Sequence, residues 1–306
     1  MVKKGIVVGT VVASVIILLL YVYKNGCWYD YSFDTAPAYT HNDRTRPLRV
    51  ATLNTAMITP QFVGMGSNVA RMRHILDRVP SLDIDVLCLQ EVFDPCSQKA
   101  LTVWCQINGW YCSIDTEMGR FLIGSNSGLA ILSRYPIQEA NNEAYSDYAG
   151  DEFFARKGIR HIKVITPQDT YHIYNTHLQT GGIKKSSLRK FDQREHTLSS
   201  GQEIKKSQVA QALKFVTQHG SRNAMLCGDF NLNHTEVVKL ARESGLTFPL
   251  RDTFARSSSQ YHFSNSHQTE RIDLILDISG ELTGSSTITN HFGRLTDHLS
   301  AVAILD

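Results

Sequence analysis

The chain has 306 residues, of which 42% are apolar and 20% charged, a composition close to that of ordinary globular proteins. Its length suits one large domain or two small ones. A formal net charge of +2 at pH 7 is too small to argue for a nucleic-acid-binding protein or for an acidic ligand, so composition leaves the function open.

The N-terminus carries an uncharged apolar run, GIVVGTVVASVIILLLYVY, at residues 5–23. As a helix, a run of this length rises about 28 Å, close to the roughly 30 Å hydrocarbon core of a bilayer. It is longer than the apolar region of about 7 to 15 residues in a cleaved signal peptide, and no clean A-x-A cleavage site follows it. We therefore predict that residues 1–23 form a single-pass transmembrane helix that anchors the chain, with a secreted protein as the alternative.

The rest of the chain divides into a linker and one domain. Residues 24–47 are polar and aromatic without helical or strand periodicity, which is typical of a linker. Residues 48–306 show no second break in composition and no internal repeat, so we expect a single domain.

Two amphipathic segments of this domain predict helices. The first, residues 67–80, begins at the potential N-cap Ser67, and the second spans residues 201–220. In the first, apolar side chains at helical spacing leave the arginines for solvent: Val69, Met72, Leu76 and Val79 against Arg71, Arg73 and Arg78. The second repeats the pattern with Val209, Ala212, Leu213 and Val216.

Short runs rich in Val, Ile, Leu and Tyr predict strands with at least one buried face. They are residues 48–54, 85–92, 127–133, 159–165, 171–177, 223–229, 271–277 and 298–305. Many strands and few helices favour an α/β sandwich in which sheet packs on sheet. Helix–strand alternation is too sparse for a barrel of repeated βα units.

A long polar loop is expected at residues 181–201, with five Lys or Arg against two acids. Loops of this length are usually functional or disordered. We predict a mobile surface loop, with contact to lipid headgroups as the alternative.

The cysteines bear on the compartment. Cys96, Cys105 and Cys112 crowd into one segment that we expect to be rich in loops, and Cys27 follows the anchor. Such crowding suits a disulfide in an oxidising lumen, although the sequence does not give the pairing. We therefore expect the globular domain to be lumenal or extracellular. Cys88 and Cys227 lie in apolar runs and are predicted to be buried thiols.

Polar side chains stand at the ends of several predicted strands. Taken singly, each fits a turn or a structural histidine. Together they indicate a site, because functional groups collect at strand ends, where a rigid scaffold meets solvent. The residues are Asn54, Glu91, His177, Asp229, Asn231, Asp273, Asp297 and His298.

The chemistry of this set is specific. Acids and amides without thiolates suit a hard divalent cation such as Mg²⁺, with Mn²⁺ as an alternative. His177 and His298 are available for acid–base work near neutral pH, and Asp273 could fix the tautomer of one imidazole. The sequence contains neither a G-x-S-x-G elbow nor a P-loop. A metal together with a His-activated water attacking a phosphorus ester is the assembly we predict.

The motifs LN (53–54), LQEV (89–92), THLQ (176–179), GDFN (228–231) and TDH (296–298) resemble, in this order, the endonuclease/exonuclease/phosphatase superfamily. This likeness runs over about residues 48–306 and implies the deoxyribonuclease I-like fold, a four-layer α/β/β/α sandwich. Further stretches are similar to the neutral sphingomyelinase branch: residues 83–94, 126–137, 150–164 and 176–180.

The resemblance implies hydrolysis of sphingomyelin, or of a related choline phospholipid, to ceramide and phosphocholine. Carried over by position, Glu91 is a metal ligand supported by Asn54 and Asp297. His298 is the general base, and Asp273 orients it.

The remaining residues of the motifs are expected to contact substrate. His177, Asp229 and Asn231 would bind and neutralise the phosphoryl oxygens as charge develops. Lys157 would help to shape or charge the substrate site. A lipid substrate also agrees with the predicted anchor, because tethering at a bilayer concentrates a catalyst on its substrate.

Two other functions remain as alternatives. One is a nuclease or another phosphoesterase of the same fold, which the small net charge does not favour. The other is an inactive, membrane-tethered binding module, which loss of a ligand or of a histidine would signal.

Overall fold

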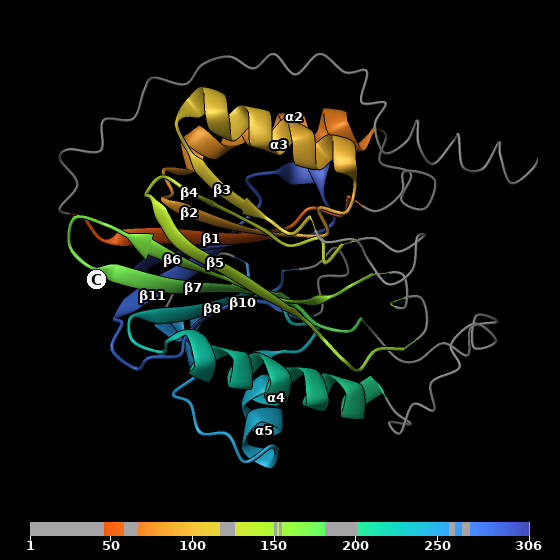
Figure 1. Cartoon of the computed structure of the whole chain (residues 1–306), viewed down its shortest axis with the longest axis vertical. Helices are drawn as coiled ribbons and strands as arrows, with labels where there is room; N and C mark the ends of the chain where they lie inside the picture. Colours follow the sequence, from red (N-terminus) through yellow and green to blue (C-terminus); the bar gives the residue numbers. More distant parts are fainter. Residues whose placement is uncertain are drawn as a thin grey trace, which may run out of the picture.

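The computed structural model describes residues 46–57, 67–116, 126–149, 152, 155–180, 201–256, 261–264 and 270–305. Within them, two six-stranded sheets lie face to face, with helices on both outer sides (Figure 1). The first strand begins at Leu48 and the last ends at Leu305.

The first sheet has the strand order β11-β12-β1-β2-β4-β3. Its strands are β1 (Leu48–Asn54), β2 (Val86–Gln90), β3 (Tyr111–Ile114), β4 (Ala130–Ser133), β11 (Gly284–Thr289) and β12 (Ser300–Leu305). The second sheet has the order β5-β6-β7-β8-β10-β9. Its strands are β5 (Ile137–Ala144), β6 (Gly158–Ile165), β7 (Thr170–His177), β8 (Ala224–Asp229), β9 (Arg251–Asp252) and β10 (Asp273–Asp277).

Helices cover the outer face of each sheet (Figure 1). Helices α2 (Asn68–Arg78) and α3 (Pro95–Asn108) pack on the first sheet, and α4 (Gly201–His219) and α5 (His234–Glu243) pack on the second. Three 3₁₀ turns complete the described elements: Val79–Leu82, Thr253–Arg256 and Gly293–Leu295. With a third apolar cluster between the sheets, the layers are the α/β/β/α sandwich that the sequence predicts.

A polar contact joins the two sheets inside this apolar layer. Gln90 of β2 donates a hydrogen bond to the side-chain oxygen of Asn175 in β7, at 2.6 Å. Asn175 in turn donates to the backbone carbonyls of Leu89 and Ala130 in the first sheet, at 2.8 and 3.0 Å. Because buried amides are costly unless they are satisfied, these bonds fix how one sheet sits on the other near the strand ends.

All the predicted strands are present, the first with the predicted bounds and the others with shifted ends, but the segment around Cys96 and Cys105 was predicted wrongly. It forms helix α3, followed by strand β3, rather than loops. A local start signal is present: Asp94 accepts a hydrogen bond from the backbone of Ser97 at 2.8 Å, and a proline occupies the first turn. The prediction also missed α5, β5 and β11.

Arg71 corrects the prediction for helix α2. Its predicted apolar face is buried, but Arg71 is buried with it instead of facing solvent. Its guanidinium donates to the carbonyls of Thr55 at 3.1 Å, Ala56 at 2.6 Å and Leu295 at 2.7 Å. Arg71 therefore ties the chain just after β1 to the chain just before β12.

No helix among the described residues is long and apolar enough to cross a membrane. The predicted anchor, the linker up to residue 45 and the basic loop at residues 181–200 lie outside the described residues.

Replacing Arg71 by methionine should lower the free energy of unfolding by about 3 kcal/mol, because two buried carbonyls and one half-buried carbonyl lose their donor, and each loss at a buried carbonyl costs about 1–3 kcal/mol. Urea unfolding of the full chain measures this. Arg78→Met on the same helix is the control: Arg78 is exposed, and its loss should change stability by less than about 0.5 kcal/mol. Equal losses in the two variants would contradict the role given to Arg71.

Candidate functional site

The strand pairing brings the predicted residues to one end of the sandwich. In the first sheet, β1 and β2 are parallel, with Asn54 opposite Gln90, the residue before Glu91. In the second, β7 and β8 are parallel, with His177 opposite Asp229. Asp273 of the antiparallel strand β10 also lies opposite Asp229. The polar ends of five strands in two sheets therefore come together at this end.

Asn54 connects the two sheets at this end. Its side-chain nitrogen donates a hydrogen bond to Asp229 Oδ2 at 2.9 Å, and the amide also donates to Glu91. Its oxygen accepts from the backbone N–H of Ala56 at 3.0 Å, which fixes the orientation of the amide. Asn54, Glu91 and Asp229 are all buried, so the amide holds two desolvated acids close together.

Burial raises the pKa of Glu91 to about 7, and the charge of Asp229 adds to this, while Lys157, Asn54 and His298 oppose it. Glu91 also has a positive φ of 59°, a left-handed conformation that is unfavourable for a residue of this type. Such strain collects at functional sites, where the surrounding structure imposes it.

His298 and Asp273 form a closely bonded pair. His298 Nδ1 donates to Asp273 Oδ2 at 2.8 Å, and its other nitrogen, Nε2, lies 3.8 Å from Asp229 Oδ2. Burial alone would lower the pKa of His298, but the carboxylates of Asp273, Asp229 and Asp297 raise it to about 10. Asp273 is in turn held by Ser264, whose hydroxyl accepts from the backbone N–H of Asp273 at 3.0 Å.

His177 and Lys157 lie on the other side of Asp229. Lys157 Nζ donates to Glu152 Oε1 at 2.8 Å, to His177 Nε2 at 2.9 Å and to the carbonyl of Leu178 at 3.1 Å. An ammonium group can only donate, so His177 Nε2 accepts and the proton sits on Nδ1. Burial lowers the pKa of His177 far below its ordinary value, and the charges of Lys157 and His298 add to this, so the ring is neutral.

The role predicted for Lys157, to shape or charge the substrate site, stays a prediction. Its three ammonium protons are engaged within the protein, and its side chain is only 6% exposed. Here Lys157 supplies positive charge next to His177 and sets the tautomer of that ring.

The GDFN turn presents Asp229 and Asn231. The backbone N–H of Asn231 donates to Asp229 Oδ1 at 2.9 Å, and the Asn231 side chain donates to the carbonyl of Leu178 at 3.1 Å. Asn231 adopts a positive φ of 49°, which asparagine tolerates well. Gly228 is required before them, because a Cβ there would lie 2.0 Å from the carbonyl oxygen of Thr176.

Negative charge is in excess at this site. The carboxylates of Glu91, Asp229, Asp273 and Asp297 all act on His298 or on each other. Asp273 Oδ1 is buried and has no hydrogen-bond partner within the described structure. Oxygen donors with uncompensated negative charge are the environment that a hard divalent cation fits.

Two sets of residues could hold such a cation. The predicted set is Glu91, Asn54 and Asp297, of which Asn54 and Glu91 are in contact and Asp297 lies near His298 and Arg71. The other set is Asp229, Asp273 and His298, whose possible ligand atoms all lie within 4.8 Å of one another. Within this second set, the bond from His298 to Asp273 favours a catalytic pair over a pair of ligands.

Sequence reasoning missed several residues that support the site. Lys205 of α4 donates to the carbonyl of Asn231 at 2.8 Å, and Thr296 donates to the carbonyl of Asn54 at 2.6 Å. Thr296 belongs to the TDH motif, so its position was a usable signal. Glu152 and Ser264 contact site residues from loops, where no periodicity reveals burial.

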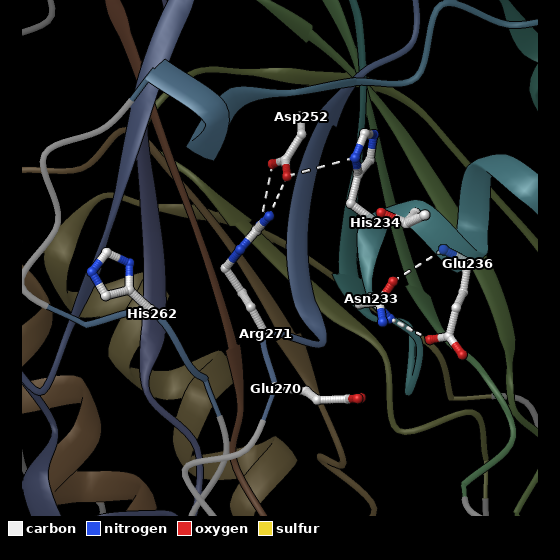
Figure 2. A pocket seen from close by; sticks show the side chains of 8 residues that line it. Asn233, His234, Glu236, Asp252, His262, Glu270 and Arg271 are labelled. Carbon is white, nitrogen blue, oxygen red and sulfur yellow. Dashed lines mark hydrogen bonds and ion pairs between the residues drawn. The ribbon is translucent and has the colours of Figure 1, made fainter.

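A polar pocket of about 660 Å³ is lined by residues of α5, of β9 and of the segments that precede α5 and β10 (Figure 2). The lining residues are Asn233, His234, Thr235, Glu236, Asp252, His262, Glu270 and Arg271. Arg271 and His234 pair with Asp252, and the backbone N–H of Asn233 donates to Glu236. The predicted site residues are not among them.

The Endonuclease/Exonuclease/phosphatase family matches residues 51–292 of the chain. That range includes every site residue described above up to Asp273, and the TDH motif follows it directly.

Two curated proteins show sequence similarity over this domain. Sphingomyelin phosphodiesterase 3 from Homo sapiens is 29% identical over 192 residues, which are 56% of this chain and 27% of the human protein. Sphingomyelinase C from Bacillus cereus is 22% identical over 277 residues, which are 80% of this chain and 79% of that protein. The chain therefore matches little more than a quarter of the human relative but most of the bacterial one.

The fold is shared with solved structures of beta toxin from Staphylococcus aureus. One has a TM-score of 0.66 and 17% identity, and covers 85% of this chain and 100% of that chain. A beta toxin variant with bound magnesium ions has a TM-score of 0.62 and 18% identity, with the same coverage. At these identities the likeness concerns the fold.

Replacing Lys157 by methionine should destabilise the chain by about 3–5 kcal/mol, because Glu152 would remain as a buried, unpaired charge. A second substitution, Glu152→Gln, should recover much of this loss, since no unpaired charge is then left. Denaturant unfolding of the two variants measures both effects.

Lys163→Met is the matched control, because Lys163 pairs with Glu139, a half-exposed partner, at 3.5 Å. Such exposed pairs contribute about 0–1 kcal/mol. A Lys157 variant no less stable than the Lys163 variant would refute the buried pair.

Proposed function

The chain belongs to the endonuclease/exonuclease/phosphatase family, and on that basis we propose that it is a metal-dependent phosphodiesterase that hydrolyses sphingomyelin to ceramide and phosphocholine. The observation that carries the proposal is the His298–Asp273 pair, placed next to an acidic cluster that Asn54 bridges. The choice of substrate rests on the sphingomyelinases to which the chain is similar.

Mg²⁺ is the proposed cofactor, with Mn²⁺ as an alternative, and a beta toxin structure of the same fold contains magnesium ions. Glu91 and Asn54 would hold it, with Asp297 close by. When bound, the cation neutralises the carboxylates and polarises the phosphoryl group.

His298 is the proposed general base. Its Nδ1–H is held by Asp273, which leaves Nε2 to take a proton from the attacking water. A P–OH bond then forms and the P–O bond to ceramide breaks. The ceramide oxygen takes a proton from water, and His298 returns its proton to solvent. Because surrounding carboxylates raise the pKa of His298 to about 10, the ring is charged near neutral pH until those carboxylates are neutralised. His298 can therefore act as a base only when a bound cation neutralises the surrounding carboxylates and the imidazole loses its proton.

The phosphoryl group would lie at the strand ends where the polar groups of the two sheets meet. Asn231, on its turn, is the proposed donor to a phosphoryl oxygen, and Asp229 holds that turn through its bond to the Asn231 backbone. Lys157 contributes positive charge through its contact with His177, which acts as a positioning residue.

The membrane context is also a proposal. The apolar run at residues 5–23 would anchor the chain in a bilayer with the catalytic domain lumenal or extracellular, and a secreted protein is the alternative. Tethering would keep the site close to its lipid substrate. A nuclease of the same fold is the second candidate function, and the small net charge of +2 argues against it.

The full chain in detergent micelles should release phosphocholine from sphingomyelin with Mg²⁺ and should lose this activity with EDTA. His298→Ala should reduce kcat by about 10²–10⁴-fold, which is the usual contribution of a general base. Asp273→Asn should also reduce kcat, because it removes the acceptor that fixes the imidazole. Phosphocholine release at saturating substrate measures each effect.

His74→Ala is the control, because the side chain of His74 is 67% exposed. Phosphatidylcholine, DNA and inositol phosphates should be assayed in parallel. Hydrolysis of DNA alone would replace the proposed substrate, and full activity of the His298 variant would refute the proposed base.

A further inference from the structure

Two pairs of cysteine thiols are in contact in the described structure. Cys105 is a hydrogen-bond partner of Cys112, and Cys88 is a hydrogen-bond partner of Cys227. All four are free thiols. Cys96, by contrast, is in a disulfide bond. The chain thus combines a formed disulfide with two pairs of adjacent thiols whose surroundings differ.

The first pair lies where helix α3 turns back into strand β3. Gly109 ends the helix with a left-handed φ of 68°, and the backbone N–H of Trp110 donates to the carbonyl of Cys105 at 2.9 Å. The chain therefore reverses directly after the helix, and Cys112 packs against the same apolar cluster that contains Cys105. Cys105 is 1% exposed, whereas Cys112 is half-buried and accessible.

The surroundings of Cys112 favour its thiolate. The hydrogen bond from Cys105 lowers the pKa of Cys112 to about 7 against the effect of burial, with help from the hydroxyl of Thr102 and the charge of Arg160. The pKa of Cys105 is raised, first by burial and then by Cys112. The half-buried Cys112 thus carries the more reactive thiol, and its fully buried partner Cys105 keeps its proton.

The pair formed by Cys88 and Cys227 has no accessible thiol. Each side chain is fully buried in the apolar layer between the two sheets, so a dissolved disulfide cannot reach either sulfur. Burial also raises the pKa of Cys88 well above its ordinary value. This second pair is a control that the chain itself provides.

We propose that Cys105 and Cys112 are a redox-active pair that oxidises to a disulfide joining the end of α3 to strand β3. With a low-molecular-weight disulfide such as glutathione disulfide, the Cys112 thiolate attacks one sulfur and releases a glutathione thiolate. That thiolate takes the proton of Cys105. The Cys105 sulfur then attacks Cys112 and displaces the second glutathione as a thiolate, which is protonated by water. Two cysteine thiols are oxidised and one glutathione disulfide is reduced to two thiols.

The disulfide would stabilise β3, the edge strand of the first sheet. Strand β3 has four residues and lies at the edge of its sheet, paired only with β4. Ser113, next to Cys112, accepts hydrogen bonds from Arg160 of the second sheet at 3.0 and 2.8 Å. A covalent link at Cys112 would therefore secure the strand that carries this contact between the sheets.

The test is peptide mapping of the full chain after exposure to glutathione disulfide, alkylation of remaining thiols and digestion with trypsin. Residues 100–120 form one tryptic peptide that contains Cys105 and Cys112 and no other cysteine. We expect this peptide to be two hydrogen atoms lighter and unalkylated. Cys88 and Cys227 should be alkylated only after unfolding. Full alkylation of the 100–120 peptide, or a persistent glutathione adduct on it, would overturn the proposal.

Serine variants distinguish the thiol that attacks glutathione disulfide, Cys112, from the thiol that then displaces glutathione, Cys105. Cys105→Ser should trap a stable mixed disulfide on Cys112, whereas Cys112→Ser should leave Cys105 at least about 10-fold less reactive than the wild-type pair, because a protonated thiol is a poor nucleophile. Equal trapping in both variants would contradict the assigned order of attack. The wild-type mapping stays decisive if either variant fails to fold.

Discussion

The side-chain amide of Asn54 is the contact on which the site depends. It belongs to the first sheet, donates to Asp229 of the second, and also donates to Glu91 at the end of the neighbouring strand. Neither sheet alone carries the complete set of groups: one supplies Glu91, the other Asp229 and Asp273. Buried acids repel one another in a low dielectric, so this placement is stable only with hydrogen bonds and positive charge that compensate it. Burying the acidic cluster therefore lowers the stability of the fold, and the same cluster makes the site suitable for a divalent cation.

The strand ends could be predicted from the sequence because the signal for them is local. An apolar run that stops at an acid, an amide or an imidazole marks the position at which a buried strand ends, and Asn54, His177 and Asp229 each end a strand in this way. The pairing of His298 with Asp273 was implied by resemblance to a family, and the structure places the two groups 2.8 Å apart. Spacing alone could not have given it, because 25 residues separate them.

What the sequence could not give are the contacts that depend on segments distant in the chain. Arg71 occupies a helical position typical of a solvent-facing arginine. It is nevertheless buried, because its guanidinium donates hydrogen bonds to the carbonyls of Thr55 and Leu295, which lie near opposite ends of the domain sequence. Lys157 was predicted to shape or charge the substrate site, but its contacts with Glu152 and with the backbone carbonyl of Leu178 could not be predicted from the sequence. The local pattern of helix α3 is weak, because polar residues interrupt its apolar ones. In each case burial is decided by tertiary structure rather than by local pattern.

The central claim is that residues from both sheets assemble one site for a divalent cation that serves phosphodiester hydrolysis. Electron paramagnetic resonance of Mn²⁺ titrated into the full chain tests it most directly, with Glu91→Gln and Asn54→Ala compared with the exposed control Glu139→Gln. The account predicts tight binding of Mn²⁺ by the wild type and by the control, and binding at least about 10-fold weaker in the other two variants, since loss of a ligand or of its support weakens metal sites to that extent. Unchanged Mn²⁺ binding in the Glu91 and Asn54 variants would contradict it.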